Sequence, residues 1–248
     1  MSLPRVLVVR AGANPFVHVG PSASVDVVEV VSHAIEPLEP PADAAGDGAD
    51  LVVFTSQVAV EMLQGAPGLA ARLRAAGARA RVAAVGPATA EALRRLGWPA
   101  DLVAEGSGDS VLHALPPRLD GQRVLLPCGE DAAPDLADGL RSRGASVRRL
   151  VVYRKRARPR DPNVDRDVIA RPFAAFCTTS PSAAAWLFDG LAADAAARLR
   201  ETPAVVLGRF TRRLLEGRGV GRIVVTPEAS FPAALRLLEQ LAAAPGAA

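Results

Sequence analysis

The stretch RVAAVGPATAEALRRLG, residues 81–97, combines an apolar run, an abrupt Gly86-Pro87 step and a helical pattern that contains Thr89. A short apolar run predicts a buried strand, and the Gly-Pro step predicts that a helix begins immediately after it. The first N–H groups of a helix lack partners and carry partial positive charge. A strand-to-helix join of this kind is therefore a candidate binding site for an anion.

The rest of the chain repeats this alternation of apolar runs and helical patterns. Apolar segments predict strands at 6–9, 25–31, 51–54, 81–85, 123–128, 148–153, 173–178, 204–208 and 222–226. They look apolar on both sides and alternate with helical patterns, which is typical of parallel sheets covered on both faces. The sequence therefore predicts an α/β fold.

The chain also contains an internal repeat, which indicates two copies of one structural unit. Three pairs of segments match in order: 6–10 with 124–128, 54–60 with 178–184, and 86–97 with 208–219. The copies differ after their first strand, since 134–144 can form a helix whereas 11–24 contains two glycines and two prolines. Because glycine and proline disfavour a helix, we predict an irregular loop or a single turn over 11–24.

Two segments have the composition of connections between compact bodies. Residues 32–50 are rich in Pro, Ala, Asp and Gly, and residues 154–167 are charged and interrupted by prolines. Such composition favours exposed, extended backbone. The basic run RKRARPR at 154–160 suits a nucleic-acid patch or a solvated linker face, and the solvated face is the default reading of such a run.

The composition limits the classes of protein to which the chain can belong. It has 248 residues, 50% of them hydrophobic, and a net charge of +3, which is typical of a globular protein and too small to indicate nucleic-acid binding. No apolar stretch reaches the roughly 18 residues of a membrane span, and the N-terminus lacks a secretory pattern. We therefore expect a cytoplasmic protein without membrane or nucleic-acid partners, and a monomer.

The cysteines and histidines show no metal-ligand spacing, so no metal site is predicted. Cys128 and Cys177 lie beside apolar runs and are expected to be small buried hydrophobes. The three histidines, His18, His33 and His113, lie in unrelated settings, and none is expected to be catalytic.

Five strand-to-helix joins carry hydroxyls or glycines. They are Thr55-Ser56, Gly86 to Thr89, Cys128-Gly129, Thr179-Ser180 and Gly208 to Thr211. In an open α/β sheet such joins gather at the edge where ligands bind. They hold few acids or bases, so the pattern predicts binding of a multiply anionic molecule rather than hydrolysis. Thr89 taken alone suits a helix cap or a ligand contact, and EGSGDS at 105–110 suits a lone Gly-Ser turn.

Four segments together resemble the uroporphyrinogen-III synthase family. They are LVVFTSQVAVEML, RVAAVGPATAEALRRLG, VLLPCGEDAAPDLADGLRSRGASVRRLVVYR and FAAFCTTSPSAAAWLF, and their order and spacing match over residues 51–190. The resemblance implies two similar flavodoxin-like parallel-sheet domains joined by two antiparallel linkers, with the chain crossing over twice. One domain would contain 1–36 and 168–248, the other 37–167, and an active-site cleft would lie between them.

The resemblance also implies the reaction. The family closes hydroxymethylbilane, a linear tetrapyrrole with eight carboxylates, into uroporphyrinogen III with loss of water and inversion of ring D, and it uses no cofactor. Such catalysis works chiefly by orientation of the substrate. The small-molecule partner would be this linear tetrapyrrole polycarboxylate.

The resemblance assigns roles to residues that match the family motifs. Tyr153, the only tyrosine, is the candidate to hydrogen-bond the departing hydroxyl, although a ring packed at the linker is equally open. Arg10 is a candidate to pair with a carboxylate of the substrate, although it could equally be a surface residue without such a role. The other candidate substrate-binding residues are Thr55, Ser56, Gly86, Thr89, Cys128, Gly129, Thr179, Ser180, Gly208 and Thr211.

The sequence departs from the family pattern in the part built from the two chain ends. GRFTR at 208–212 replaces a GPTTA-like element, and the helix after the first strand is missing. TSQ at 55–57 replaces the commoner TSP. These departures leave open an alternative function: a diverged, non-catalytic two-lobed binding or regulatory module for an anionic tetrapyrrole or another polyanionic small molecule.

Overall fold

A computed structural model describes residues 2–12, 22–41, 48–76, 79–160, 163, 166, 168 and 170–243. The chain divides into two compact units: unit 1 comprises 1–35 and 156–248, and unit 2 comprises 36–155. The domain boundaries predicted from the sequence place residues 156–167 in the central domain instead of with the chain ends. The division of the chain into those two domains stays a prediction.

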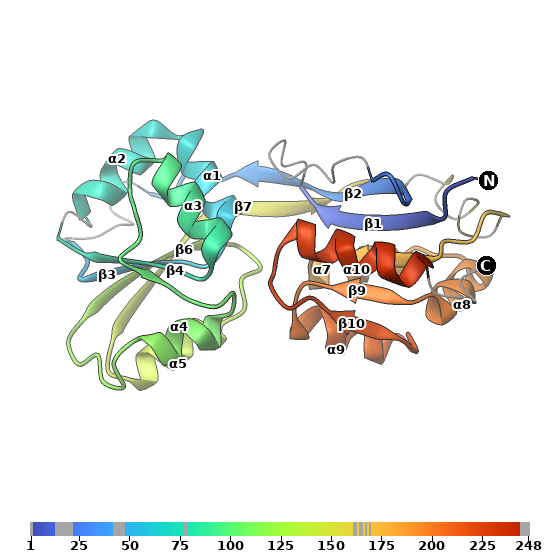
Figure 1. Cartoon of the computed structure of the whole chain (residues 1–248). Helices are drawn as coiled ribbons and strands as arrows, with labels where there is room; N and C mark the ends of the chain where they lie inside the picture. The colour runs from blue at the N-terminus through green and yellow to red at the C-terminus, as the bar shows by residue number, and fades with distance from the viewer. Residues whose placement is uncertain are drawn as a thin grey trace. The chain divides into compact units, whose positions relative to one another are not determined.

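Unit 1 is built around a parallel sheet with the strand order β2-β1-β8-β9-β10 (Figure 1). Its strands are β1 (Arg5–Ala11), β2 (Asp26–Pro37, which continues into unit 2), β8 (Ala175–Thr178), β9 (Ala204–Val206) and β10 (Ile223–Val225). Its helices include α7 (Pro181–Asp189), α8 (Ala193–Glu201), α9 (Arg209–Gly217) and α10 (Phe231–Ala243). In chain order this is the 2-1-3-4-5 arrangement of flavodoxin-like sheets.

Unit 2 has the parallel strand order β7-β6-β3-β4-β5. Its strands are β3 (Leu51–Phe54), β4 (Arg81–Ala84), β5 (Leu102–Val103), β6 (Arg123–Gly129) and β7 (Ser146–Ala157, which continues into unit 1). Its helices include α1 (Gln57–Gln64), α2 (Pro67–Ala76), α3 (Pro87–Arg95), α4 (Gly108–Ala114) and α5 (Asp135–Ser142). When β6 and β7 are matched to β1 and β2, and β3, β4 and β5 to β8, β9 and β10, the two orders coincide. The predicted repeat is confirmed.

The predicted α/β class and each predicted strand are confirmed, although several elements escaped the sequence pattern. The pattern missed α2, α8 and the short β5. The prediction of a lone Gly-Ser turn at EGSGDS is wrong. Ser107 caps α4 there and forms a capping box with Ser110. The loop predicted over 11–24 lies mostly outside the described residues.

The two predicted connections begin as strand rather than as exposed chain. β2 runs on to Pro37 and β7 to Ala157, and Ser32 and His33 in β2 are buried. Within unit 1, the Arg158 N–H donates to the Ser32 carbonyl at 2.9 Å. Within unit 2, the Leu38 N–H donates to the Val152 carbonyl at 2.9 Å. The later residue of the first segment bonds to the earlier residue of the second, so the two segments run antiparallel at these bonds. That they are linkers between two domains stays a prediction.

The sheet of unit 1 is covered on both faces. On β1, Leu7 and Val9 join one apolar cluster with side chains of α7, α8 and α9, while Val6 and Val8 join a second cluster with α10. Neighbouring side chains of a strand point to opposite faces, so the continuous apolar run serves both layers. Each fully buried Val or Leu contributes roughly 1.5–3 kcal/mol to folding.

In unit 2, Leu51, Val53 and Val124 pack with α4 and α5 on one face of the sheet. Helices α1 and α3 contact the strands and each other. The strands of each unit are parallel, so their carboxyl ends lie at the same edge of the sheet. The strand-to-helix joins that follow these ends therefore lie along that edge within each unit.

The basic run 154–160 makes contacts within its own units. Arg154 pairs with Glu36 at 2.7 Å, Lys155 pairs with Asp131 at 2.9 Å, and the Arg160 guanidinium donates to the Leu187 carbonyl at 2.8 Å. These are the contacts of a partly packed linker face. No helix in the described part of the chain is long and apolar enough to cross a bilayer.

Candidate functional site

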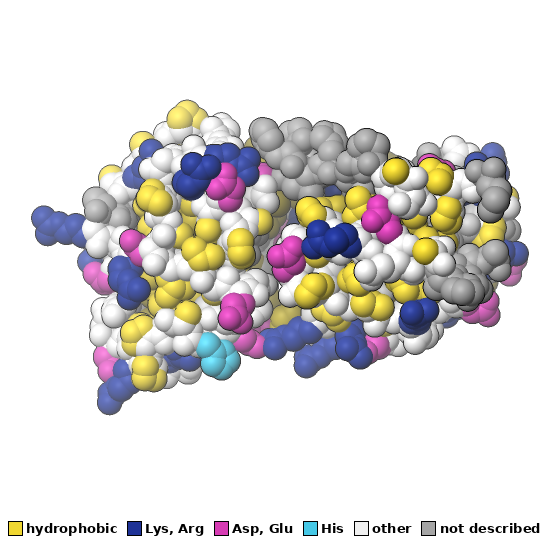
Figure 2. Space-filling view, in the orientation of Figure 1, with side chains coloured by type: hydrophobic (Ala, Val, Ile, Leu, Met, Phe, Trp, Pro, Cys, Tyr) yellow, Lys and Arg dark blue, Asp and Glu magenta, His cyan; other side chains and the backbone are white. Residues whose placement is uncertain are grey.

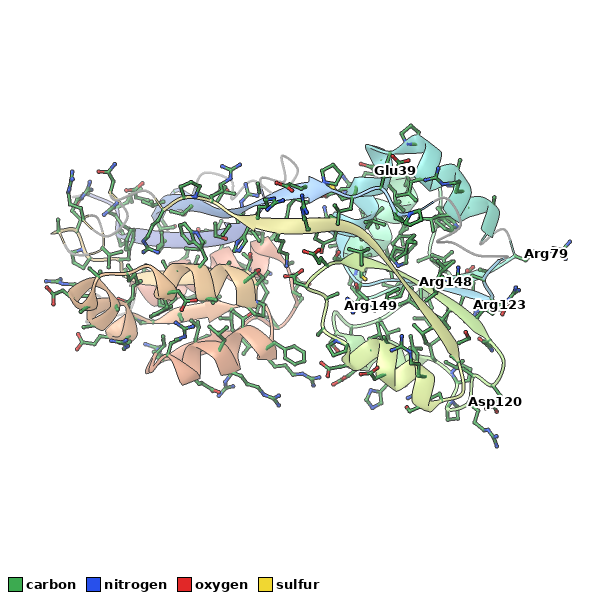
Figure 3. The ribbon with its side chains drawn as sticks, turned by 180° about the vertical axis from the view of Figure 1, so that it is seen from behind. Glu39, Arg79, Asp120, Arg123, Arg148 and Arg149 are labelled. Carbon is green, nitrogen blue, oxygen red and sulfur yellow. The ribbon has the colours of Figure 1, made fainter. Side chains whose placement is uncertain are left out.

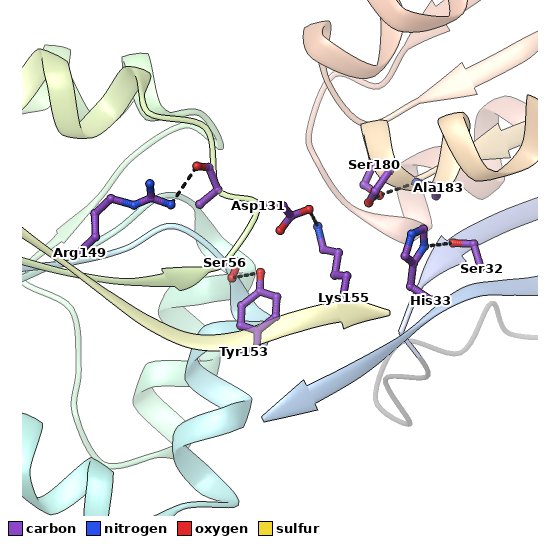
Figure 4. Close-up of polar contacts among 11 residues, drawn as sticks. Ser32, His33, Ser56, Asp131, Arg149, Tyr153, Lys155, Ser180 and Ala183 are labelled. Carbon is purple, nitrogen blue, oxygen red and sulfur yellow. Dashed lines mark hydrogen bonds and ion pairs between the residues drawn. The ribbon is translucent and has the colours of Figure 1, made fainter. Parts of the chain in front are cut away.

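At the edge of the unit 2 sheet, the joins after β3 and β6 lie on neighbouring strands. This is the point at which the strand order reverses, where flavodoxin-like folds bind ligands. Ser56 caps α1, since its Oγ accepts the Ala59 N–H at 3.1 Å. The same Oγ lies 3.4 Å from the Tyr153 hydroxyl (Figure 4). Thr55 precedes it and is half-buried.

The Tyr153 ring packs against the end of β6. The β6–β7 register shifts after Cys128, and this bulge places Gly129 opposite Tyr153. A Cβ atom at Gly129 would lie 2.7 Å from the ring carbon Cζ of Tyr153, so any larger residue there would require the ring to move. The contact with the tyrosine ring explains why residue 129 is a glycine. This contact was not predicted from the sequence.

The Tyr153 phenol is buried, with 5% of the residue exposed. Burial raises its pKa above the ordinary value of 10.0, opposed by the hydrogen bond with Ser56 and the positive charge of Lys155. The negative charge of Asp131 raises the pKa further. The phenol therefore stays protonated through the neutral range and can donate a hydrogen bond.

The loop that follows Gly129 is held on β7 by three contacts. The Glu130 N–H donates to the Tyr153 carbonyl at 2.9 Å, and the Lys155 ammonium pairs with Asp131 at 2.9 Å. Arg149, which projects from β7 in Figure 3, donates to the Ala132 carbonyl at 3.0 Å. The sequence motifs had not singled out Lys155 or Asp131.

Gly86 is the N-cap of α3, and it offers no side-chain cap. A Cβ atom there would lie 3.2 Å from the Gly106 Cα, so the glycine allows close packing of the next loop. Thr89 lies inside the first turn of α3 and is only 3% exposed. The helix-cap interpretation of Thr89 is therefore wrong, and its role in binding stays a prediction that burial disfavours.

In unit 1, Arg10 at the end of β1 is buried and already paired. Its guanidinium forms an ion pair with Glu29 on β2 and donates to the Gly12 carbonyl. The Ser32 hydroxyl donates to the Arg10 carbonyl at 3.0 Å. The surface interpretation of Arg10 is wrong, because the residue is only 6% exposed. Its pairing with a substrate carboxylate stays a prediction, since in this structure it pairs with Glu29.

The β8 join repeats the β3 join. Ser180 caps α7 by accepting the Ala183 N–H at 3.2 Å, as Ser56 caps α1. Thr179 is half-buried, and its N–H donates to the Val9 carbonyl at 3.1 Å. Next to it, the buried Thr178 Oγ1 has no hydrogen-bond partner among the described residues.

The β9 join differs from its counterpart in unit 2. Gly208 is the N-cap of α9, and no described atom lies within 4 Å of a Cβ atom built there. A side chain at Gly208 would therefore contact no described neighbour, unlike one at Gly86. Thr211, in contrast, is only 3% exposed inside α9. In Figure 2, basic side chains gather over α9, whose sequence carries Arg209, Arg212 and Arg213.

Both cysteines are free thiols and fully buried. The expectation that they are small buried hydrophobes is confirmed. A contact between the Cys128 sulfur and the substrate stays a prediction. The burial of this thiol in β6 gives it no support. No group of three or more potential metal ligands occurs within the described ranges.

Cys177 is expected to resist alkylation in the native protein. Burial raises its pKa to about 12. Since the thiolate is the reactive form, such a pKa lowers the reactive fraction at about pH 8 roughly 1,000-fold relative to an ordinary thiol. Iodoacetamide labelling followed by mass spectrometry measures this, with guanidinium-unfolded protein as the control. Equal labelling rates in both states would contradict the burial of Cys177.

The structure thus brings Ser56, Gly129 and Tyr153 together in unit 2, and it joins Arg10 to Glu29 in unit 1. It buries Thr89 and Thr211, which lie inside the first turns of α3 and α9. The site residues that sequence reasoning missed are recognised from the register between neighbouring strands. A local sequence motif contains no information on that register.

A family model described as uroporphyrinogen-III synthase HemD matches residues 21–236, most of the chain. The chain belongs to the uroporphyrinogen-III synthase family. The match covers all five strand-to-helix joins, so the resemblance extends beyond the central segments, while residues 6–10 of β1 lie before the matched range.

Solved structures of uroporphyrinogen-III synthases share this fold. A mutant of the Thermus thermophilus enzyme has a TM-score of 0.66 at 24% identity, covering 96% of this chain and 98% of that one. The Helicobacter pylori enzyme has a TM-score of 0.60 at 18% identity, covering 96% and 100%. No match was found among curated proteins.

Proposed function

We propose that this chain is a uroporphyrinogen-III synthase, a hydro-lyase that converts hydroxymethylbilane into uroporphyrinogen III. The carrying observation is the family match over residues 21–236. The buried, protonated phenol of Tyr153 at the ligand edge of unit 2 supports it. We also propose that the protein is a cytoplasmic monomer that needs no cofactor and that binds neither membrane nor nucleic acid.

Tyr153 is proposed to hydrogen-bond the hydroxyl that leaves the substrate. The C–O bond of the hydroxymethyl group breaks, the electron pair stays with oxygen, and that oxygen leaves as water after gaining a proton. A neutral phenol can donate to the departing oxygen, whereas a phenolate would repel it. The pKa of Tyr153, which burial raises, favours the donor form.

The remaining residues are proposed to bind carboxylates and hold the shape of the substrate. Each unit offers helix N-termini whose N–H groups suit anions: α1 behind Thr55 and Ser56, and α7 behind Thr179 and Ser180. The N-terminus of α9, which Gly208 begins without a side-chain cap, is proposed as a third. Catalysis by orientation needs these donors more than it needs acids and bases.

One assay tests the reaction. Freshly prepared hydroxymethylbilane is supplied to the purified chain, the product is oxidised, and the uroporphyrin isomers are separated by chromatography. We expect isomer III in excess over the enzyme-free background. Isomer I alone, formed at the background rate, would contradict the proposal and support a non-catalytic tetrapyrrole-binding module instead.

A further inference from the structure

The first turn of α9 in unit 1 exposes a large aromatic side chain. Phe210 is the second residue of this helix, and 46% of it is exposed. Long side chains of a helix point back toward its N-terminus, so the ring covers the surface at the start of α9. That start follows the end of β9 and lies at the carboxyl edge of the sheet, where flavodoxin-like folds bind ligands.

The internal repeat shows that the fold does not need this ring. When residues 86–97 are matched to 208–219, the counterpart of Phe210 is Ala88 on α3, which is also exposed. Both helices begin at a glycine N-cap with extended backbone, and both bury a threonine in the first turn. The same helix start therefore forms without an aromatic residue, so packing does not explain Phe210.

Two arginines accompany the ring on the surface of α9. The Arg209 guanidinium lies over the ring of Phe210, with its Cζ 5.1 Å from the ring centroid. Arg213 lies three residues after Phe210, so both side chains lie on the same side of the helix. Arg213 is exposed and forms no ion pair with another residue that the structure describes. These three residues form what we call the α9 patch.

The charges of the α9 patch are unfavourable for the helix itself. Arg209 places a cation at a helix N-terminus, and Arg209 and Arg213 are like charges four residues apart. In α3 the same two positions carry Pro87, which suits a helix start, and Glu91, which pairs with Arg94 at 2.8 Å. Local features that oppose the fold are expected at functional sites. The α9 patch is therefore better explained by a ligand than by stability.

We propose that Phe210 stacks on a pyrrole ring of the tetrapyrrole and that Arg213 binds a carboxylate carried by the same part of the molecule. This inference rests on the proposed function. A linear tetrapyrrole with eight carboxylates presents flat rings bordered by negative charge. The α9 patch presents the complement, because an aromatic face suits a flat ring and a guanidinium suits a carboxylate.

Substitutions at Phe210 test the stacking. Phe210→Ala introduces the residue that the other copy of the unit carries, so the variant is expected to fold. We expect it to raise the Kd for uroporphyrin III, the oxidised form of the proposed product, about 10-fold. Phe210→Tyr keeps an aromatic face and should stay within about twofold of wild type. Fluorescence quenching of the porphyrin measures both, and a tyrosine variant as weak as the alanine variant would overturn the stacking.

The substitution Arg213→Glu tests the charge of the α9 patch. It introduces the acidic residue that α3 carries at this position, and we expect it to raise the Kd for uroporphyrin III about 10-fold. The difference from wild type should shrink at about 1 M salt, since salt screens exposed charges. Unchanged affinity in this variant would overturn the role of Arg213. It would also overturn the whole inference if Phe210→Ala proved unstable.

Leu3→Ala is the matched control for Phe210→Ala. Leu3 is also 46% exposed, but it precedes β1 and so lies at the opposite, amino edge of the same sheet. Its Kd should stay within about twofold of wild type, because exposed substitutions away from a site change little. Thermal melting and size-exclusion chromatography of each variant monitor folding and self-association. Unchanged affinity in folded Phe210→Ala would overturn the inference, and a change in self-association alone would assign the ring to contact with a second copy.

The wild-type chain separates this inference from the proposed function. Isomer III from wild type, together with wild-type Kd and KM in Phe210→Ala, would refute the role of Phe210 alone. Tight uroporphyrin binding without isomer III would refute the synthase function, and the affinity of Phe210→Ala would still decide the role of Phe210. A wild-type chain that neither turns over nor binds the tetrapyrrole would refute both.

Discussion

Replacing Tyr153 with phenylalanine is expected to lower kcat about 100-fold, as loss of a donor to a leaving group commonly does. Phenylalanine keeps the ring that covers Gly129 and removes only the hydroxyl. Because the hydroxyl is proposed to act on the bond that breaks, its loss should affect turnover more than binding. Initial rates of isomer III formation and titration with uroporphyrin III measure the two effects separately.

The stability of Tyr153→Phe serves as the internal control. The contact of the phenol with Ser56 is long, at 3.4 Å, so its loss should change the free energy of unfolding by less than about 1 kcal/mol. A variant that keeps wild-type kcat would remove Tyr153 from the mechanism and leave it a ring packed at the linker. A variant that loses affinity and turnover equally would make Tyr153 a binding residue instead.

The Gly129→Ala variant is expected to lose both stability and activity. The new methyl group would lie 2.7 Å from the Cζ and 2.9 Å from the hydroxyl of Tyr153, so the ring must move. Overpacking of this kind costs about 1–3 kcal/mol of unfolding free energy. Displacing the phenol should also lower kcat about 10-fold or more, since small misplacements of a positioned group are costly. Chemical denaturation and the isomer assay measure these effects.

Gly68→Ala is the matched control for this substitution. Gly68 lies on the exposed first turn of α2, where no described atom comes within 4 Å of the new methyl group. Alanine is a better helix former, so stability should stay the same or rise by up to about 1 kcal/mol. In a Tyr153→Ala background the cost of Gly129→Ala should fall, because the clashing ring is gone. An equal cost in both backgrounds would show that the ring does not explain Gly129.

Local sequence pattern was sufficient for the framework of this protein. Strand β3 was predicted with its observed bounds, Leu51–Phe54, because four apolar residues end at a polar join. Ser56 and Ser180 were recognised at helix starts, and both cap their helices. The repeat predicted from three pairs of segments is present in the strand order of the two sheets.

Local pattern was insufficient wherever one element had to meet another. Thr89 and Thr211 resemble accessible caps in the sequence, yet a glycine caps each helix and the threonines turn inward. Arg10 resembles a ligand for external carboxylates, yet β2 brings Glu29 beside it. The partner in each case lies on a strand or helix that the motif does not contain.

The sequence by itself determined the α/β class, the repeated unit and the hydroxyl-bearing joins, because hydrophobic periodicity and helix starts depend on neighbours a few residues away. Only the tertiary structure decided that Gly129 makes room for Tyr153 and that Arg10 pairs with Glu29 on the neighbouring strand. Those relations depend on the register between parallel strands and on a bulge that shifts it by one residue. Register is set by packing over the whole sheet, which no short stretch of sequence contains.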